Sequence, residues 1–133
     1  MAALLSTVSH LLATVAVILV AAGLFFASDR RRHVPLMFAA FALDMTGLVL
    51  VEFITPLVAG TIDPVRSLTK SGVPTIVWVH AAMSTAFTVC YILQIVSGKR
   101  LLRADRGALG IHKSTAKVFV VTRLIAYVTM FFV

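Results

Sequence analysis

The chain has 133 residues, of which 60% are hydrophobic and only 13% are charged, and its mean hydropathy is +1.03. A soluble domain carries about 25% charged residues, and a chain this short cannot bury so many apolar side chains in one core. A soluble enzyme, a disordered chain and a disulfide scaffold are therefore excluded, the last because Cys90 is the only cysteine. We expect a single integral membrane domain over residues 1–133, in contact with a lipid bilayer.

The net charge of +7 and the sequence pI of 10.6 raise the question of nucleic-acid binding. Most of the basic residues, however, stand in two short runs between apolar segments, which is typical of juxtamembrane charges. No recognisable nucleic-acid module or set of stacking aromatic residues accompanies them. We therefore expect no nucleic-acid partner.

Four apolar runs are long enough for spanning helices, which need about 20 residues each. They cover about residues 4–27, 34–59, 73–97 and 114–133. Pro35 and Pro74 fall in the first turns of the second and third runs, where a missing N–H costs nothing. Because lipid offers no partner to a free backbone amide, the sequence predicts an all-α fold, a transmembrane antiparallel four-helix bundle.

The connections between the runs predict the orientation in the membrane. The first connection contains three arginines at 30–32, and the third contains five basic residues between 99 and 113, whereas the middle one contains only Arg66 and Lys70. Basic connections stay on the cytoplasmic side. Both termini are then expected on the outer side of a multi-pass protein of the inner, cytoplasmic membrane.

Three ionisable side chains lie at similar depths in the outer halves of three spans: His10, Glu52 and His80. A rise of about 1.5 Å per residue places each of them roughly 9–10 Å from the outer end of its span. Two imidazoles suit axial ligation of haem b. All three groups together form a two-histidine, one-carboxylate set that suits a non-haem transition metal ion. A hydrogen-bonded polar seam between helices is the third interpretation.

Two further levels carry polar residues. His33 and His112 stand at the inner ends of the second and fourth spans, where they form either an inner cofactor site or ordinary interfacial residues. Asp44 and Arg123 lie near the middle, roughly 14–15 Å along their spans. Opposite charges at one depth predict a structural ion pair that sets the helix register.

Catalytic motifs are absent from the sequence: it has no glycine-rich phosphate loop, no Ser-His-Asp set and no CxxCH motif. No catalytic residue is therefore predicted, and the expectation leans away from an enzyme. A small proton-coupled transporter using Asp44, Glu52 and Arg123 is an alternative. It would need a homodimer, and the chain lacks the internal repeat that many transporters show.

Three histidine-bearing segments are RRRHVPLM, VWVHAAMS and IHKSTAKVFVVTRLIAYVT. Over about residues 30–133, they resemble a bacterial family of small four-helix membrane proteins that includes maturation factors for haem-A-containing cytochrome oxidases. The resemblance is carried by His33, Met37, His80, His112, Lys113, Tyr127 and Thr129. The chain departs from the family at His10, where an Asn-type residue is expected, and at Arg123, where an apolar or aromatic residue is expected.

The resemblance implies a respiratory accessory role, and the histidines predict a bound cofactor. We therefore expect a membrane protein that binds haem b or a transition metal ion for electron transfer or cytochrome oxidase assembly. Its partners would be respiratory oxidase subunits or a second copy of the chain. The alternative is a non-catalytic small subunit or scaffold of a larger membrane complex.

Overall fold

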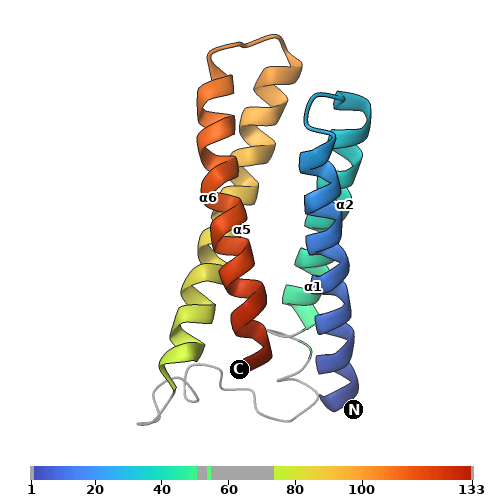
Figure 1. The fold of residues 1–133 in the computed structure, drawn as a ribbon, viewed down its shortest axis with the longest axis vertical. Helices are drawn as coiled ribbons and strands as arrows, with labels where there is room; N and C mark the ends of the chain where they lie inside the picture. Colours follow the sequence, from blue (N-terminus) through green and yellow to red (C-terminus); the bar gives the residue numbers. More distant parts are fainter. Residues whose placement is uncertain (1, 51–53, 55–73, 133) are drawn as a thin grey trace. The chain divides into compact units, whose positions relative to one another are not determined.

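The computed structural model describes residues 2–50, 54 and 74–132. This part of the chain is helical throughout, apart from its turns (Figure 1). The elements are α1 (Ala2–Phe25), α2 (Arg30–Val49), α5 (Thr75–Leu102), α6 (Ala108–Thr129) and the short 3-10 helix η2 (Met130–Phe132). They divide into two compact units, residues 1–73 and residues 74–133. In the first unit α1 packs against α2, and in the second α5 packs against α6; we call these pairs the first and the second hairpin. The expected all-helical fold is confirmed.

In the described part of the chain, three helices are long and apolar enough to cross a membrane. These segments are Leu4–Phe25, Thr75–Leu102 and Ala108–Phe132, with 22, 28 and 25 residues. Large apolar side chains cover their outer surfaces, and Ile18, for example, is 60% exposed. Such a surface suits lipid as the solvent. The expected second span is only partly described, because residues 51–53 and 55–59 lie outside the described residues.

The helices extend beyond the predicted spans on the sides of the basic runs. α2 begins at Arg30 rather than at 34, α5 ends at Leu102 rather than at 97, and α6 begins at Ala108 rather than at 114. Arginine, lysine and leucine are good helix formers, so the helices continue through the charged residues that a search for apolar runs excludes. Pro35 consequently lies inside α2 instead of in its first turn, and it cannot donate the helical bond to the Arg31 carbonyl.

The turn of the first hairpin ends at a capped helix. The Asp29 carboxylate accepts a hydrogen bond from the Arg31 amide at 3.0 Å, as a helix N-cap does. The same carboxylate lies 3.3 Å from the Arg32 guanidinium, which also stacks over the Phe26 ring at 4.9 Å. Together, these contacts determine where α2 starts.

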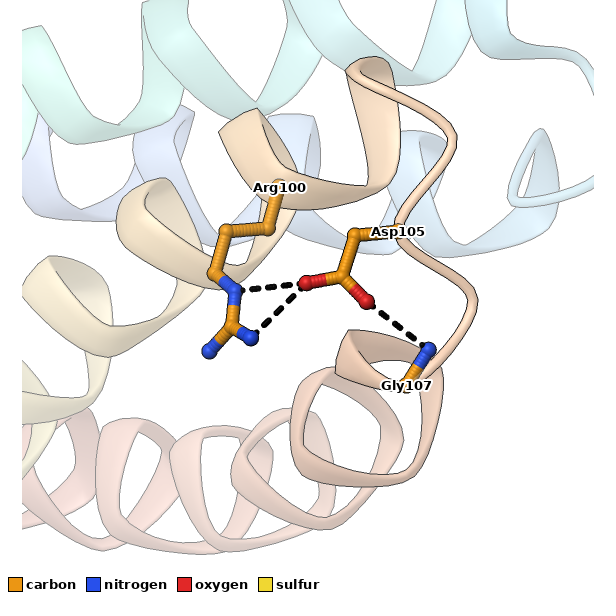
Figure 2. A network of polar contacts seen from close by, with 3 residues as sticks. All are labelled: Arg100, Asp105 and Gly107. Atoms are coloured by element: carbon orange, nitrogen blue, oxygen red, sulfur yellow. Dashed lines mark hydrogen bonds and ion pairs between the residues drawn. The ribbon is translucent and has the colours of Figure 1, made fainter.

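The turn of the second hairpin closes α5 with a Schellman motif. The Asp105 amide donates to the Arg100 carbonyl at 3.1 Å, and the Ala104 amide donates to the Leu101 carbonyl at 3.1 Å. Figure 2 shows the Asp105 side chain, whose carboxylate binds the Arg100 guanidinium at 2.7 Å and accepts the Gly107 amide at 3.0 Å. The five-residue turn is thereby fastened to both helices. Ala104 has the left-handed backbone conformation of this motif, with φ 64°.

Replacing Ala104 by glycine is expected to stabilise the protein. An alanine in the left-handed conformation costs roughly 1–2 kcal/mol. Glycine removes this cost, but its greater freedom in the unfolded chain offsets part of the stabilisation. The net expectation is a stabilisation of about 0.5–1 kcal/mol, measured by thermal unfolding in detergent. Ala82→Gly on the exposed face of α5 is the matched control, because an ordinary helical glycine should destabilise by about 1 kcal/mol. A loss of stability in both variants would contradict the motif.

Aromatic side chains fill the centre of the second hairpin. Tyr91 on α5 and Phe119 on α6 are 2% and 1% exposed, and their ring centroids lie 4.5 Å apart. Phe87 extends this cluster, with its ring centroid 6.1 Å from that of Tyr91. In the first hairpin the two helices approach closely at Gly23, where an added Cβ would lie 2.8 Å from the Met37 sulfur. Each hairpin thus has packed contacts of its own, which hold its histidines in place.

Candidate functional site

The imidazole of His80 connects the first turns of α5 with the last turn of α6, at the open end of the second hairpin. Its Nδ1 lies 3.0 Å from the Thr129 hydroxyl oxygen on α6. That hydroxyl already donates its single proton to the Ile125 carbonyl at 2.8 Å, so its oxygen accepts from His80. The proton of neutral His80 is therefore on Nδ1, and Nε2 carries the lone pair. The Ser84 hydroxyl, one turn along α5, lies 3.4 Å from this Nε2.

His112 repeats this arrangement at the other end of the same hairpin. Its Nδ1 lies 2.9 Å from the Ser97 hydroxyl oxygen on α5, and Ser97 donates its own proton to the Leu93 carbonyl at 2.7 Å. Ser97 therefore accepts, and His112 is also an Nδ1–H tautomer. The Gln94 amide strengthens the junction by donating to the His112 carbonyl at 2.9 Å and to the Thr115 hydroxyl at 2.6 Å.

The two histidines of the first hairpin use backbone carbonyls. His33 on α2 has its Nδ1 2.8 Å from the Gly23 carbonyl oxygen on α1. His10 has its Nδ1 2.6 Å from the Ser6 carbonyl oxygen, one turn earlier in α1. A carbonyl oxygen only accepts hydrogen bonds, so Nδ1 donates in both contacts.

All four histidines of the chain thus share one tautomer. In each, Nδ1 donates to an oxygen of the protein, and Nε2 of the neutral ring carries the lone pair. Histidines that ligate metal ions or haem iron have this arrangement, because a hydrogen bond from the second nitrogen orients the ring and makes the ligating nitrogen more basic. In this arrangement Nε2 is the nitrogen that would hold haem iron or a metal ion, and in His80 the Ser84 hydroxyl lies 3.4 Å from it.

The predicted ligand groups are divided between the two units. His10 and His33 belong to the first hairpin, and His80 and His112 belong to the second. Glu52 lies outside the described residues. Among residues 2–50, 54 and 74–132, no group of three or more His, Cys, Asp or Glu side chains is placed to hold a metal ion. The two pairs and the trio with Glu52 stay predictions.

Within each hairpin the two histidines occupy different levels. In the second, Thr129 and His112 are separated by 17 residues of helix, about 25 Å of axial length. In the first, His10 and Gly23 are separated by 13 residues of α1, about 20 Å. One hairpin therefore does not bring its own two imidazoles to a common ligand.

The predicted ion pair also joins residues of different units. Asp44 on α2 is 8% exposed, and Arg123 on α6 is 4% exposed. Inside the second hairpin, the Arg123 guanidinium lies over the Phe87 ring at 5.0 Å from the centroid and over the Tyr127 ring at 6.0 Å. Cation–π contacts of this kind stabilise a buried cation. The pairing of Arg123 with Asp44 stays a prediction.

Sequence reasoning predicted none of the four Nδ1 partners, and Thr129 was named only as a position of the resemblance. Ser97 stands at the predicted end of a span, next to a basic run, where a serine attracts no notice. The Gly23 partner is a backbone carbonyl, for which a sequence carries no signal. The one clue in the sequence is Gly23 itself, since a glycine within an apolar helix permits a second helix to approach closely.

Comparisons with models of protein families, with curated proteins and with solved structures returned no match. The class of this chain is therefore given by its fold alone. Over the described residues it is an all-helical protein of two hairpins, three of whose helices have the length and composition of membrane spans.

Proposed function

We propose that this chain is a multi-pass protein of the inner membrane, with its hairpins joined in an antiparallel four-helix bundle. Three helices of spanning length support this placement. Exposed basic residues surround the turns of both hairpins, among them Arg31 and Arg103, and such turns remain in the cytoplasm. Both termini then lie on the outer side. Extraction of membranes at alkaline pH should leave the protein in the pellet, and release into the supernatant would refute the placement.

Within this bundle, the protein binds haem b or a transition metal ion through its histidines. His10 and His80 are the proposed outer ligands, with Glu52 as a third ligand of a bare metal ion. His33 and His112 are the proposed inner pair. The single observation that supports the proposal is that Nδ1 of each ring contacts an oxygen of the protein, the arrangement that ligating histidines have.

The resemblance of residues 30–133 to a family with cytochrome oxidase maturation factors adds the biological setting. A bound haem or redox-active metal would supply one-electron chemistry. The role of the chain is to orient the imidazoles: Thr129 and Ser97 fix two rings from a neighbouring helix, while the carbonyls of Ser6 and Gly23 fix the other two. Electron transfer or oxidase assembly, with oxidase subunits as partners, is the proposed outcome.

The test is the absorption spectrum of the purified full chain in mild detergent, oxidised and then reduced with dithionite, together with a metal analysis of the same sample. A Soret band that sharpens and shifts on reduction is the expected result for haem, and one stoichiometric metal ion is the expected result for a bare site. A sample that contains neither would refute cofactor binding.

A second candidate function is a small non-catalytic subunit of a larger membrane complex. It is favoured by the fact that three of the four imidazole contacts join the two helices of a hairpin: His33 with Gly23, His80 with Thr129 and His112 with Ser97. Polar contacts of this kind hold transmembrane helices together, at roughly 0.6 kcal/mol each and up to about 1.7 kcal/mol. For this function, His80→Ala lowers the unfolding temperature of a protein that carries no cofactor.

A further inference from the structure

One face of α6 carries two lysines that have no partner in the described part of the chain. Lys113 and Lys117 are four residues apart, so they lie one above the other on the helix. Both side chains are exposed, and neither makes an ion pair or hydrogen bond with any residue of the described ranges. Lys117 lies nine residues beyond the start of α6 at Ala108, about 13 Å along the helix.

The same face continues with aliphatic side chains toward the other end of α6. Val121, Leu124 and Val128 are 57%, 48% and 55% exposed. At 3.6 residues per turn, these three residues and the two lysines lie within an arc of about 80°. The distance from Lys117 to Val128 is eleven residues, about 16 Å. This length is close to half of the hydrocarbon thickness of a bilayer, about 15 Å.

We propose that this face of α6 binds an anionic phospholipid of the surrounding bilayer. The phosphate of the headgroup lies at Lys113 and Lys117, and an acyl chain lies along Val121, Leu124 and Val128. Lysine stems run easily along apolar surface while the ammonium group stays at the headgroup level. The two lysines are complementary to the charged headgroup of one lipid molecule, and the aliphatic residues that follow are complementary to its acyl chain.

The charges of the turn between α5 and α6 also favour the binding of an anion. Asp105 is the only acidic residue between 74 and 133, and its carboxylate is already bound to the Arg100 guanidinium and the Gly107 amide (Figure 2). Arg103 and Arg106 are exposed in the same turn and add positive charge. Basic clusters at the cytoplasmic boundary of a membrane helix attract anionic headgroups.

The inference rests on the membrane placement in the proposed function and not on cofactor binding. Native mass spectrometry of the full chain in neutral detergent tests it, with phosphatidylglycerol or phosphatidylcholine of identical acyl chains as the added lipid. Phosphatidylglycerol should bind more tightly. Because each lysine near an anionic surface contributes roughly fivefold to binding, Lys113→Gln/Lys117→Gln should weaken it about 25-fold.

The controls distinguish lipid binding at Lys113 and Lys117 from a general effect of the net charge of the protein. Lys113→Arg/Lys117→Arg should retain the binding, and Arg30→Gln/Arg31→Gln, which removes the same charge from the first hairpin, should change it less than about twofold. Inorganic phosphate at the same concentration should not compete. Equal affinity for the two lipids, or equal losses in the two glutamine variants, would overturn the proposal. A protein without haem or metal that still prefers phosphatidylglycerol would refute only the cofactor.

Discussion

The double variant His10→Ala/His80→Ala is expected to lose the proposed outer cofactor completely. Both nitrogens that would hold the cofactor disappear. Neither histidine has a second imidazole at the same depth in its own hairpin, because the other histidine of each hairpin lies about 20–25 Å away along the helices. The measurement is the Soret absorbance and metal content for each mole of purified protein. Circular dichroism of the same sample should still show a helical chain.

The control is the inner pair. His33→Ala/His112→Ala removes two imidazoles that each join the helices of a hairpin, whereas His10→Ala/His80→Ala removes one such contact, so the control costs at least as much in helix packing. This variant should retain the outer cofactor, and a protein with two haems should keep half of its Soret absorbance. Unchanged cofactor content in the His10→Ala/His80→Ala variant would show that these two residues are not ligands.

Replacing Thr129 by valine is expected to weaken cofactor binding about 10–100-fold, the usual cost of removing the hydrogen-bond partner of a ligating histidine. Valine retains the shape of threonine but offers no oxygen to Nδ1 of His80. The ring then loses the contact that sets its orientation and tautomer. The measurement is cofactor affinity, together with the reduction potential, which a purely structural role of Thr129 would leave unchanged.

Thr122 is a matched control on the same helix. Both threonines are buried, at 8% exposure for Thr122 and 6% for Thr129, and both donate to the carbonyls three and four residues earlier. Only Thr129 contacts an imidazole. Thr122→Val should therefore leave affinity and potential unchanged. Equal effects of the two substitutions would show that Thr129 acts through helix packing and does not position His80.

The sequence predicted the helices better than their ends. Three apolar segments are confirmed as long helices because length and composition alone decide that property. The helices extend beyond the predicted spans into the basic runs, at Arg30, Leu102 and Ala108. Capping by Asp29 and the Schellman turn at Ala104 determine these ends, and neither depends on hydrophobicity.

The candidate site was predicted as a set of residues but not as a set of contacts. The histidines are conspicuous in apolar segments, because a buried imidazole needs a partner. The identity of the partner depends on which helix lies alongside. Ser97 meets His112 where α6 begins at Ala108, ahead of the predicted span, and the Gly23 carbonyl meets His33 where α2 begins at Arg30.

The most direct test of this account is the tautomer of each imidazole, read from nitrogen NMR of histidine-labelled protein in detergent micelles. With four histidines in the chain, the spectrum is simple enough to assign by single substitution. At a pH where the rings are neutral, we expect the proton on Nδ1 and the lone pair on Nε2 in all four. Protonated Nε2 in His80 and His112 would contradict the orientation of these rings by Thr129 and Ser97.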